Sequence, residues 1–109
     1  MPEELDAEDA KLVTLARAAR ARIGAAEGAA VRDGDGRTYA GATVALPSVK
    51  LAALDLAVAS ATAAGASTLE AAVVVSESSI VDISAVRDLS ADAPVYLARH
   101  DGSVVDTKL

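Results

Sequence analysis

The most regular pattern of apolar positions runs from Pro47 to Gly65, where the chain reads PSVKLAALDLAVASATAAG. Ser48 is suited to cap the start of a helix here, and Gly65 is suited to end it in a left-handed conformation. Because the flanks are almost all alanine, we expect a central helix that a sheet or other subunits cover on several sides. Its larger apolar residues recur at intervals of three and four positions, which places them on one stripe: Leu51, Leu54, Val58 and Ala61.

A second helix is predicted from about Leu5 to Ile23. Its start is acidic and its end basic, which suits the helix dipole. The arginines at its end indicate a solvated face rather than an anion site, because so many carboxylates lie nearby in the sequence. The acidic residues are Glu3, Glu4, Asp6, Glu8 and Asp9, the arginines are Arg17, Arg20 and Arg22, and the expected buried stripe is Leu12, Leu15, Ala16, Ala19 and Ile23.

The next pattern predicts a β-hairpin. Two strand-like stretches, 28–33 and 37–45, flank Gly34-Asp35-Gly36, and Asp-Gly pairs at this spacing favour turns that need positive φ. The string Asp33-Gly34-Asp35-Gly36 also invites a calcium-binding interpretation. An EF-hand loop needs a glutamate at its twelfth position, however, and counting from Asp33 that position is Val44. We therefore favour a plain turn.

The second half of the chain predicts the rest of a sheet. The apolar run Glu70–Ser76 is typical of a strand covered on both faces. The stretch DISAVRDLS predicts a short helix capped near Asp82, and residues 93–109 predict two strands around an Asp101-Gly102 turn. This order of helices and strands indicates a single α/β domain over residues 1–109, a sandwich with a mixed sheet.

Composition and charge narrow the function classes. The chain is 52% hydrophobic but only 2% aromatic, without Trp or Phe, so its core must consist of Val, Leu, Ile and Ala, and we expect subunit contacts to add stability. A net charge of -6 argues against non-specific binding of nucleic acid or anionic membranes. The absence of cysteine removes disulfides and thiolate chemistry. With an acidic N-terminus and no apolar run of membrane-spanning length, we expect a soluble, cytoplasmic protein.

Several motifs together carry a resemblance to a known family. A G-A-A strand (residues 28–30) is followed by the hairpin motif D-G-R-x-Y-x-G (residues 35–41), and near the end P-V-Y-L (residues 94–97) precedes Asp101-Gly102. In this order and spacing, the chain from about Lys11 to Val105 resembles the small, homotetrameric cytidine deaminases. The resemblance implies a three-layer sandwich with a mixed five-stranded sheet and helices on both faces. It also implies a homo-oligomer, either a tetramer or a dimer.

The first zinc motif of that family does not carry over. Zinc deaminases place a Cys or His two residues before a Glu on one helix, and the Glu moves protons. Counted back from Gly65, the family's C-A-E triplet falls on residues 52–54. The resemblance thus assigns the ligand position to Ala52 and the acid/base position to Leu54. No His, Cys or Glu occurs from Leu46 to Ser67, so a shifted alignment would not supply them.

The second zinc motif is also replaced. The family's P-C-x-x-C-R falls on residues 82–87, with Ile83 and Val86 where two thiolates would stand and Arg87 retained. A hydrocarbon side chain has no lone pair to offer zinc. We therefore expect a site filled by apolar side chains, with no metal, no other cofactor and no catalytic residue.

The substrate-binding residues of the family are changed as well. The aromatic position of its F-x-V-G-A-A segment falls near Ala25, and the N-x-E pair that binds ribose falls on Thr43 and Ala45. The chain is about three residues shorter between this pair and the helix. We regard all three as vestigial positions.

Other candidates for chemistry are weak. His100, the only histidine, lies in the turn sequence R-H-D-G, and no converging partner for it can be named. Ser76, Ser78 and Ser79 beside Glu77 lack a nearby histidine or a nucleophile elbow, so we interpret them as loop residues and caps.

Three functional hypotheses follow. We favour a non-catalytic, oligomeric structural or interaction module of the deaminase fold, a pseudoenzyme without zinc. The alternative is a protein that binds a nucleoside or nucleotide in a remodelled pocket. A lesser alternative is an active nucleoside (cytidine) deaminase with unfamiliar chemistry. Function depends on the site and not on the fold, so each needs its own test.

Overall fold

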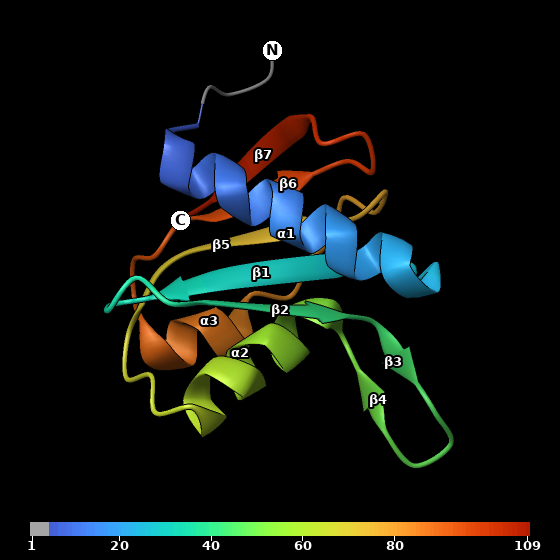
Figure 1. Ribbon diagram of the computed structural model, residues 1–109, viewed down its shortest axis with the longest axis horizontal. Coiled ribbons are helices and arrows are strands. Elements are labelled where there is room, and N and C mark those ends of the chain that lie inside the picture. Colours follow the sequence, from blue (N-terminus) through green and yellow to red (C-terminus); the bar gives the residue numbers. More distant parts are fainter. Residues whose placement is uncertain (1–4) are drawn as a thin grey trace.

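The structure is a computed structural model that describes residues 5–109, and Glu3 and Glu4 lie outside this range. The described residues form a five-stranded sheet between two helical layers (Figure 1). Strands lie in the order β2-β1-β5-β6-β7; β5 and β6 are parallel and the other neighbours antiparallel. The mixed α/β sandwich expected from the sequence is thereby confirmed. The strands of this sheet are β1 (Gly28–Asp33), β2 (Thr38–Ala42), β5 (Leu69–Val75), β6 (Val95–Ala98) and β7 (Val104–Lys108).

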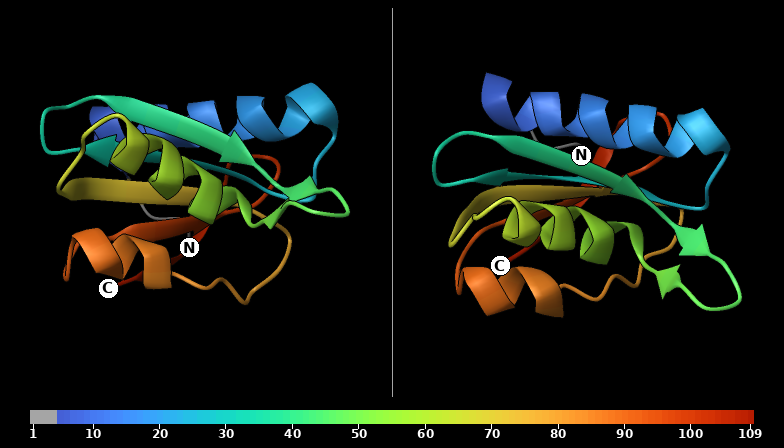
Figure 2. Two further views of the ribbon diagram at one scale, coloured as in Figure 1. Left: turned by 90° about the horizontal axis from the view of Figure 1, so that it is seen from below. Right: turned by 60° about the horizontal axis from the view of Figure 1, so that its bottom comes forward.

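Helix α1 (Ala7–Ile23) covers one face of the sheet, and α2 (Ala53–Ala63) and α3 (Ser84–Leu89) cover the other (Figure 2). Successive residues of a strand point to opposite faces, so the sheet supports two separate cores. In β5, Ala72 and Val74 belong to the cluster beneath α2 and α3, whereas Val73 and Val75 belong to the cluster beneath α1. This explains the uninterrupted apolar run of the strand.

Helix α1 begins two residues later than expected and presents a different face. Asp6 caps it, its Oδ1 accepting a hydrogen bond of 2.8 Å from the backbone N–H of Asp9, and Gly24 ends it with φ +62°. Leu12, Ala16 and Ala19 are buried as expected, but Leu15 is 36% exposed and Ile23 is 65% exposed. The buried face includes Asp9 and Val13 instead, because the helix rotates Leu15 away from the sheet and Ile23 lies in its last turn.

A buried ion pair joins α1 to the sheet. Arg32 of β1 donates hydrogen bonds of 2.8 Å to Asp9 and to Glu70, and the Tyr96 hydroxyl donates one of 2.9 Å to the second oxygen of Asp9. The carboxylate of Asp9 therefore enters the interior with partners on both oxygens, which such burial requires.

The predicted central helix is wrong in its first third. Residues 47–52 do not belong to it: Ser48 caps nothing, and the N-cap position is Ala52, without a side-chain hydrogen bond. Instead β3 (Val44–Ala45) and β4 (Lys50–Leu51) form a small second hairpin that the sequence pattern does not predict. It turns through Pro47 and Ser48, where the main chains of Leu46 and Val49 exchange hydrogen bonds of 2.8 and 3.3 Å.

The remainder of α2 follows the prediction. Leu54, Val58 and Ala61 are buried against the sheet, and Gly65 follows the helix with φ +99°. The opposite side of α2 is exposed rather than covered, since within residues 5–109 no other layer lies on it. None of the helices described here is both long and apolar enough to cross a membrane.

Candidate functional site

The positions that the resemblance assigns to zinc and proton transfer lie at the starts of α2 and α3. Leu54, in the first turn of α2, is 2% exposed, and Val86 of α3 is fully buried in the same apolar cluster. Ile83, the residue before α3, packs against that cluster and is partly buried. Ala52 differs, because it is exposed just before α2.

These residues do not fit a zinc ion. Zinc needs nitrogen, sulfur or oxygen ligands, and all four side chains are hydrocarbons. His100 does not supply a ligand at these positions. It lies between β6 and β7, with its Nε2 3.2 Å from the carbonyl oxygen of Ala26. Among the described residues, no three His, Cys, Asp or Glu side chains converge in a way that would hold a metal. The four side chains at these positions therefore offer zinc no ligand atom, and Leu54 cannot carry a proton.

Arg87, the residue retained from the second motif, is engaged elsewhere. Its Nη1 donates hydrogen bonds of 2.8 Å to the carbonyl oxygen of Ala93 and 3.3 Å to that of Ser90. These are the carbonyl groups after the end of α3, so the guanidinium fixes the connection from α3 to β6. In this chain Arg87 therefore stabilises the loop between α3 and β6.

On the substrate side, Thr43 follows β2 and is paired with the chain before β1. Its Oγ1 accepts a hydrogen bond of 3.1 Å from the backbone N–H of Glu27 and lies 3.3 Å from the carbonyl oxygen of Glu27. Ala45 is exposed on β3, and Ala25 is partly buried, its carbonyl accepting a hydrogen bond of 3.1 Å from Arg20. The structure brings Thr43 next to Glu27, the residue before β1, but places Ala45 on the separate hairpin of β3 and β4.

One polar cluster at this edge is not indicated by the sequence pattern. Ser76 follows β5, is 2% exposed and donates a hydrogen bond of 2.8 Å to the carboxylate of Glu27. Arg99 follows β6 and donates to the carbonyl oxygens of Ser76 and Ser78 at 3.1 and 2.9 Å. The carboxyl ends of parallel strands are where open α/β sheets bind ligands. The signal was a polar residue directly after each strand, but it has meaning only once β5 and β6 are known to be parallel neighbours.

The serines behave as the sequence predicted. Ser76 Oγ accepts a hydrogen bond of 3.0 Å from the backbone N–H of Ser78, and Ser78 Oγ accepts one of 3.1 Å from that of Ile80. The backbone N–H of His100 donates to Glu77 at 2.9 Å. The Ser78 hydroxyl thus fixes a local turn, whereas Ser76 and Glu77 also hold more distant segments through Glu27 and His100. Among the described residues, the only hydrogen-bond contact of the His100 ring is with the carbonyl oxygen of Ala26, so no imidazole is aligned on a serine hydroxyl there.

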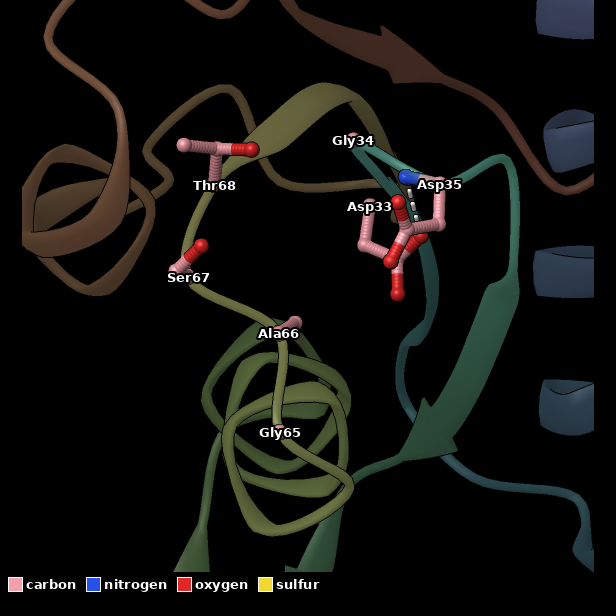
Figure 3. A pocket seen from close by; sticks show the side chains of 7 residues that line it. All are labelled: Asp33, Gly34, Asp35, Gly65, Ala66, Ser67 and Thr68. Carbon is pink, nitrogen blue, oxygen red and sulfur yellow. Dashed lines mark hydrogen bonds between the residues drawn. The ribbon is translucent and has the colours of Figure 1, made fainter.

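The hollow in Figure 3 lies at the other end of β1. It measures about 150 Å³ and separates the β1–β2 turn from the segment after α2. The carboxylate of Asp33 is buried here, and it accepts hydrogen bonds of 2.9 Å from the backbone N–H groups of Asp35 and Arg37 and from the Tyr39 hydroxyl. Burial alone would raise the pKa of Asp33, but these hydrogen bonds together lower it below its ordinary value. The Asp-Gly string therefore builds the predicted turn, with φ +84° at Gly36. The hollow is lined by Asp33, Gly34, Asp35, Gly65, Ala66, Ser67 and Thr68.

The layer order and the sheet topology define the class, an α/β sandwich of the deaminase type. The family model described as cytidine deaminase-like matches residues 5–102, nearly the whole chain. The chain therefore belongs to the cytidine deaminase-like family. Among solved structures, the crystal structure of cytidine deaminase from Burkholderia pseudomallei is similar, with a TM-score of 0.71 and 27% sequence identity over 90% of this chain and 89% of that one. No curated protein matches the sequence.

Proposed function

We propose that this protein is a non-catalytic member of the cytidine deaminase-like family, a zinc-free homo-oligomer that acts as a structural or interaction module. The observation that carries the proposal is the chemistry of the three zinc-ligand positions and the one acid/base position. Hydrocarbon side chains stand at all four, and the chain holds no cysteine and one histidine. Three of the four, Leu54, Ile83 and Val86, pack in or against one apolar cluster.

Deamination by this fold depends on water that zinc activates and on a carboxylate that moves the proton. The zinc-ligand and proton-carrier positions hold only hydrocarbon side chains. The two carboxylates near the starts of α2 and α3 are exposed, and one of them, Asp82, accepts hydrogen bonds from the backbone N–H and the hydroxyl of Ser84. The nearest carboxylate of the polar cluster, Glu27, already accepts a hydrogen bond from the buried Ser76. This arrangement supports a structural or interaction role, which needs a stable fold and a binding surface but no catalytic group.

The test is to measure the zinc content and the cytidine deaminase activity of protein produced in zinc-supplemented medium. We expect far less than one zinc per chain and no deamination. The His100→Ala variant is the control, because any zinc lost with that exposed imidazole is surface binding. One tightly held zinc per chain in both proteins, together with turnover of cytidine, would overturn the proposal.

The alternative, a nucleoside or nucleotide binder, has one observation in its favour. Thr43 places a polar hydroxyl at one of the two positions that the resemblance assigns to ribose binding, although this hydroxyl is paired with the main chain of Glu27. A thermal-shift screen decides, because a ligand at a hundred times its Kd adds about 2.7 kcal/mol to stability. Stabilisation by cytidine that Thr43→Val abolishes would favour this alternative, and an unchanged melting temperature across nucleosides and nucleotides would remove it.

A further inference from the structure

The small hairpin of β3 and β4, here called the arm (Val44–Leu51), stands apart from the rest of the molecule. Figures 1 and 2 show it extending beyond the edge of the five-stranded sheet, past the start of α2. Its two strands pair only with each other. Isolated two-stranded hairpins are marginally stable in water, so an arm of this kind gains stability when a surface covers it.

The tip of the arm is apolar and exposed. Leu46 is 57% exposed and Val49 is 44% exposed, and Pro47 between them is exposed as well. Single exposed apolar residues need no explanation, but three of the four exposed tip residues are apolar, with only Ser48 between them polar, and such a group on a projecting element indicates an interaction site.

The charge distribution indicates what covers this tip. From Val44 to Ala66 the chain carries one cation, Lys50, and one anion, Asp55, so this stretch is neutral while the whole chain carries -6. Copies of an anionic protein repel one another, and they approach most readily through a neutral surface. Neither Lys50 nor Asp55 forms an ion pair within residues 5–109, although both are exposed.

The neighbouring side of α2 offers space for a close contact. Its exposed residues in line with Asp55 are short, namely Ala52, Ala59 and Ala63. A partner can therefore reach Asp55 without displacing large side chains. The arm leads directly into the start of α2, where Ala52 and Asp55 are exposed, and we take the arm and this side of α2 as one surface.

We propose that a second copy of this chain docks on that surface through a two-fold axis, with the arms covering each other and Lys50 of one copy beside the partner's Asp55. In such an interface each contact occurs twice, and the one cation and the one anion of the surface satisfy each other. The inference deepens the proposed homo-oligomer by naming the surface and the charges that select its partner.

The test combines charge reversal with mixing, read by light scattering and analytical ultracentrifugation. Lys50→Glu and Asp55→Lys each place like charges in the interface and should each weaken self-association about tenfold or more. Mixing these two variants should restore assembly, because each then meets the opposite charge on the other at both contacts. The double variant Lys50→Glu/Asp55→Lys should also associate like the parent.

The arm tip is tested by Leu46→Asp, which should prevent assembly in every combination. Val105→Asp is the matched control, since Val105 is 48% exposed on β7, the edge strand opposite β2. Circular dichroism checks that all variants are folded. A parent that assembles while the two charge variants stay dissociated on mixing would overturn this surface and leave the proposed oligomer standing. A monomeric parent would overturn both.

Discussion

Leu54 illustrates how one side chain can decide the chemistry of a site. It is 2% exposed and shares its buried cluster with Val86, so hydrocarbon from two helices meets where the resemblance assigns a proton carrier and a thiolate. Such a position holds packing atoms in close contact. A single polar side chain introduced at position 54 would therefore find no hydrogen-bond partner in this cluster.

We therefore expect Leu54→Glu to lower the free energy of unfolding by about 3 kcal/mol or more, because it buries a carboxylate without a cation or donor. Urea denaturation followed by circular dichroism measures the change. Ala18→Glu, on the exposed side of α1, is the control and should stay within about 0.5 kcal/mol of the parent. Equal stability of the Leu54 variant and the parent would mean that position 54 is solvated.

Asp33 gives a pH-dependent contribution to stability. Burial raises its pKa, but the hydrogen bonds from Arg37, Tyr39 and Asp35 outweigh burial, and the folded pKa lies below the ordinary 3.8. The stabilisation is thus present above the unfolded value and is lost as the pH falls through the folded one. Asp33→Asn should melt at a lower temperature than the parent at pH 7, and the difference should shrink below about pH 4. Asp88→Asn, at an exposed position of α3, is the comparison; a gap for Asp33→Asn that stays constant down to pH 2 would contradict the assignment.

At the scale of elements, two glycines set how closely the helices approach the sheet. A Cβ at Gly28 of β1 would overlap the carbonyl oxygen of Ala16 and lie 2.9 Å from the Cβ of Arg20, both on α1. On the other face, a Cβ at Gly41 of β2 would lie 3.0 Å from the carbonyl oxygen of Ala53 in α2. Each helical layer therefore packs directly against glycine backbone in the β1–β2 hairpin.

Gly28→Ala should consequently cost about 3 kcal/mol or more, at the upper end of overpacking effects, because the obstacle is helix backbone that cannot swing aside. Gly34→Ala is the matched control: its Cβ would meet only the side chain of Thr68, at 2.5 Å from Oγ1, which can rotate. Thermal denaturation of both variants compares them. If the two glycines proved equally tolerant, α1 would not rest on β1 as described.

The elements differ in how far sequence alone could predict them. The strand Glu70–Ser76 was close to β5 (Leu69–Val75) because an apolar run has one simple explanation. The arm was missed because Ser48 after Pro47 looks like a helix start, whereas the two residues occupy a tight turn whose strand pairing is only visible in three dimensions. Leu15 and Ile23 were misplaced because α1 consists mostly of alanine and arginine, and so carries little contrast between its faces.

For the whole molecule, the fold could be predicted because motifs along nearly the full chain agreed with one family. For the site, the sequence could predict which residues stand at the family's positions, but not how those residues pack together. That Leu54 and Val86 share a cluster follows from the crossing of α2 and α3 over the sheet. The Glu27–Ser76 contact joins residues 49 positions apart, and no local pattern specifies it.

The proposed absence of zinc predicts that chelators leave the stability of the protein unchanged. Structural metal sites contribute binding energy to folding, and their proteins unfold when the metal is removed. We expect the melting temperature with excess EDTA to equal that without it, and added zinc to leave it unchanged. A clear fall with EDTA that zinc reverses would show that a metal supports the fold after all.

The place of β5 has a consequence for how the chain is made. It is the middle strand, yet it is the third of the five sheet strands to be synthesised, and its pairing with β1 joins Gly28 to Val75. On the ribosome, the finished first hairpin therefore waits with an open edge until β5 emerges, and contacts so distant in sequence form slowly. The nascent chain is most vulnerable to misassembly during this interval, before its centre has been translated.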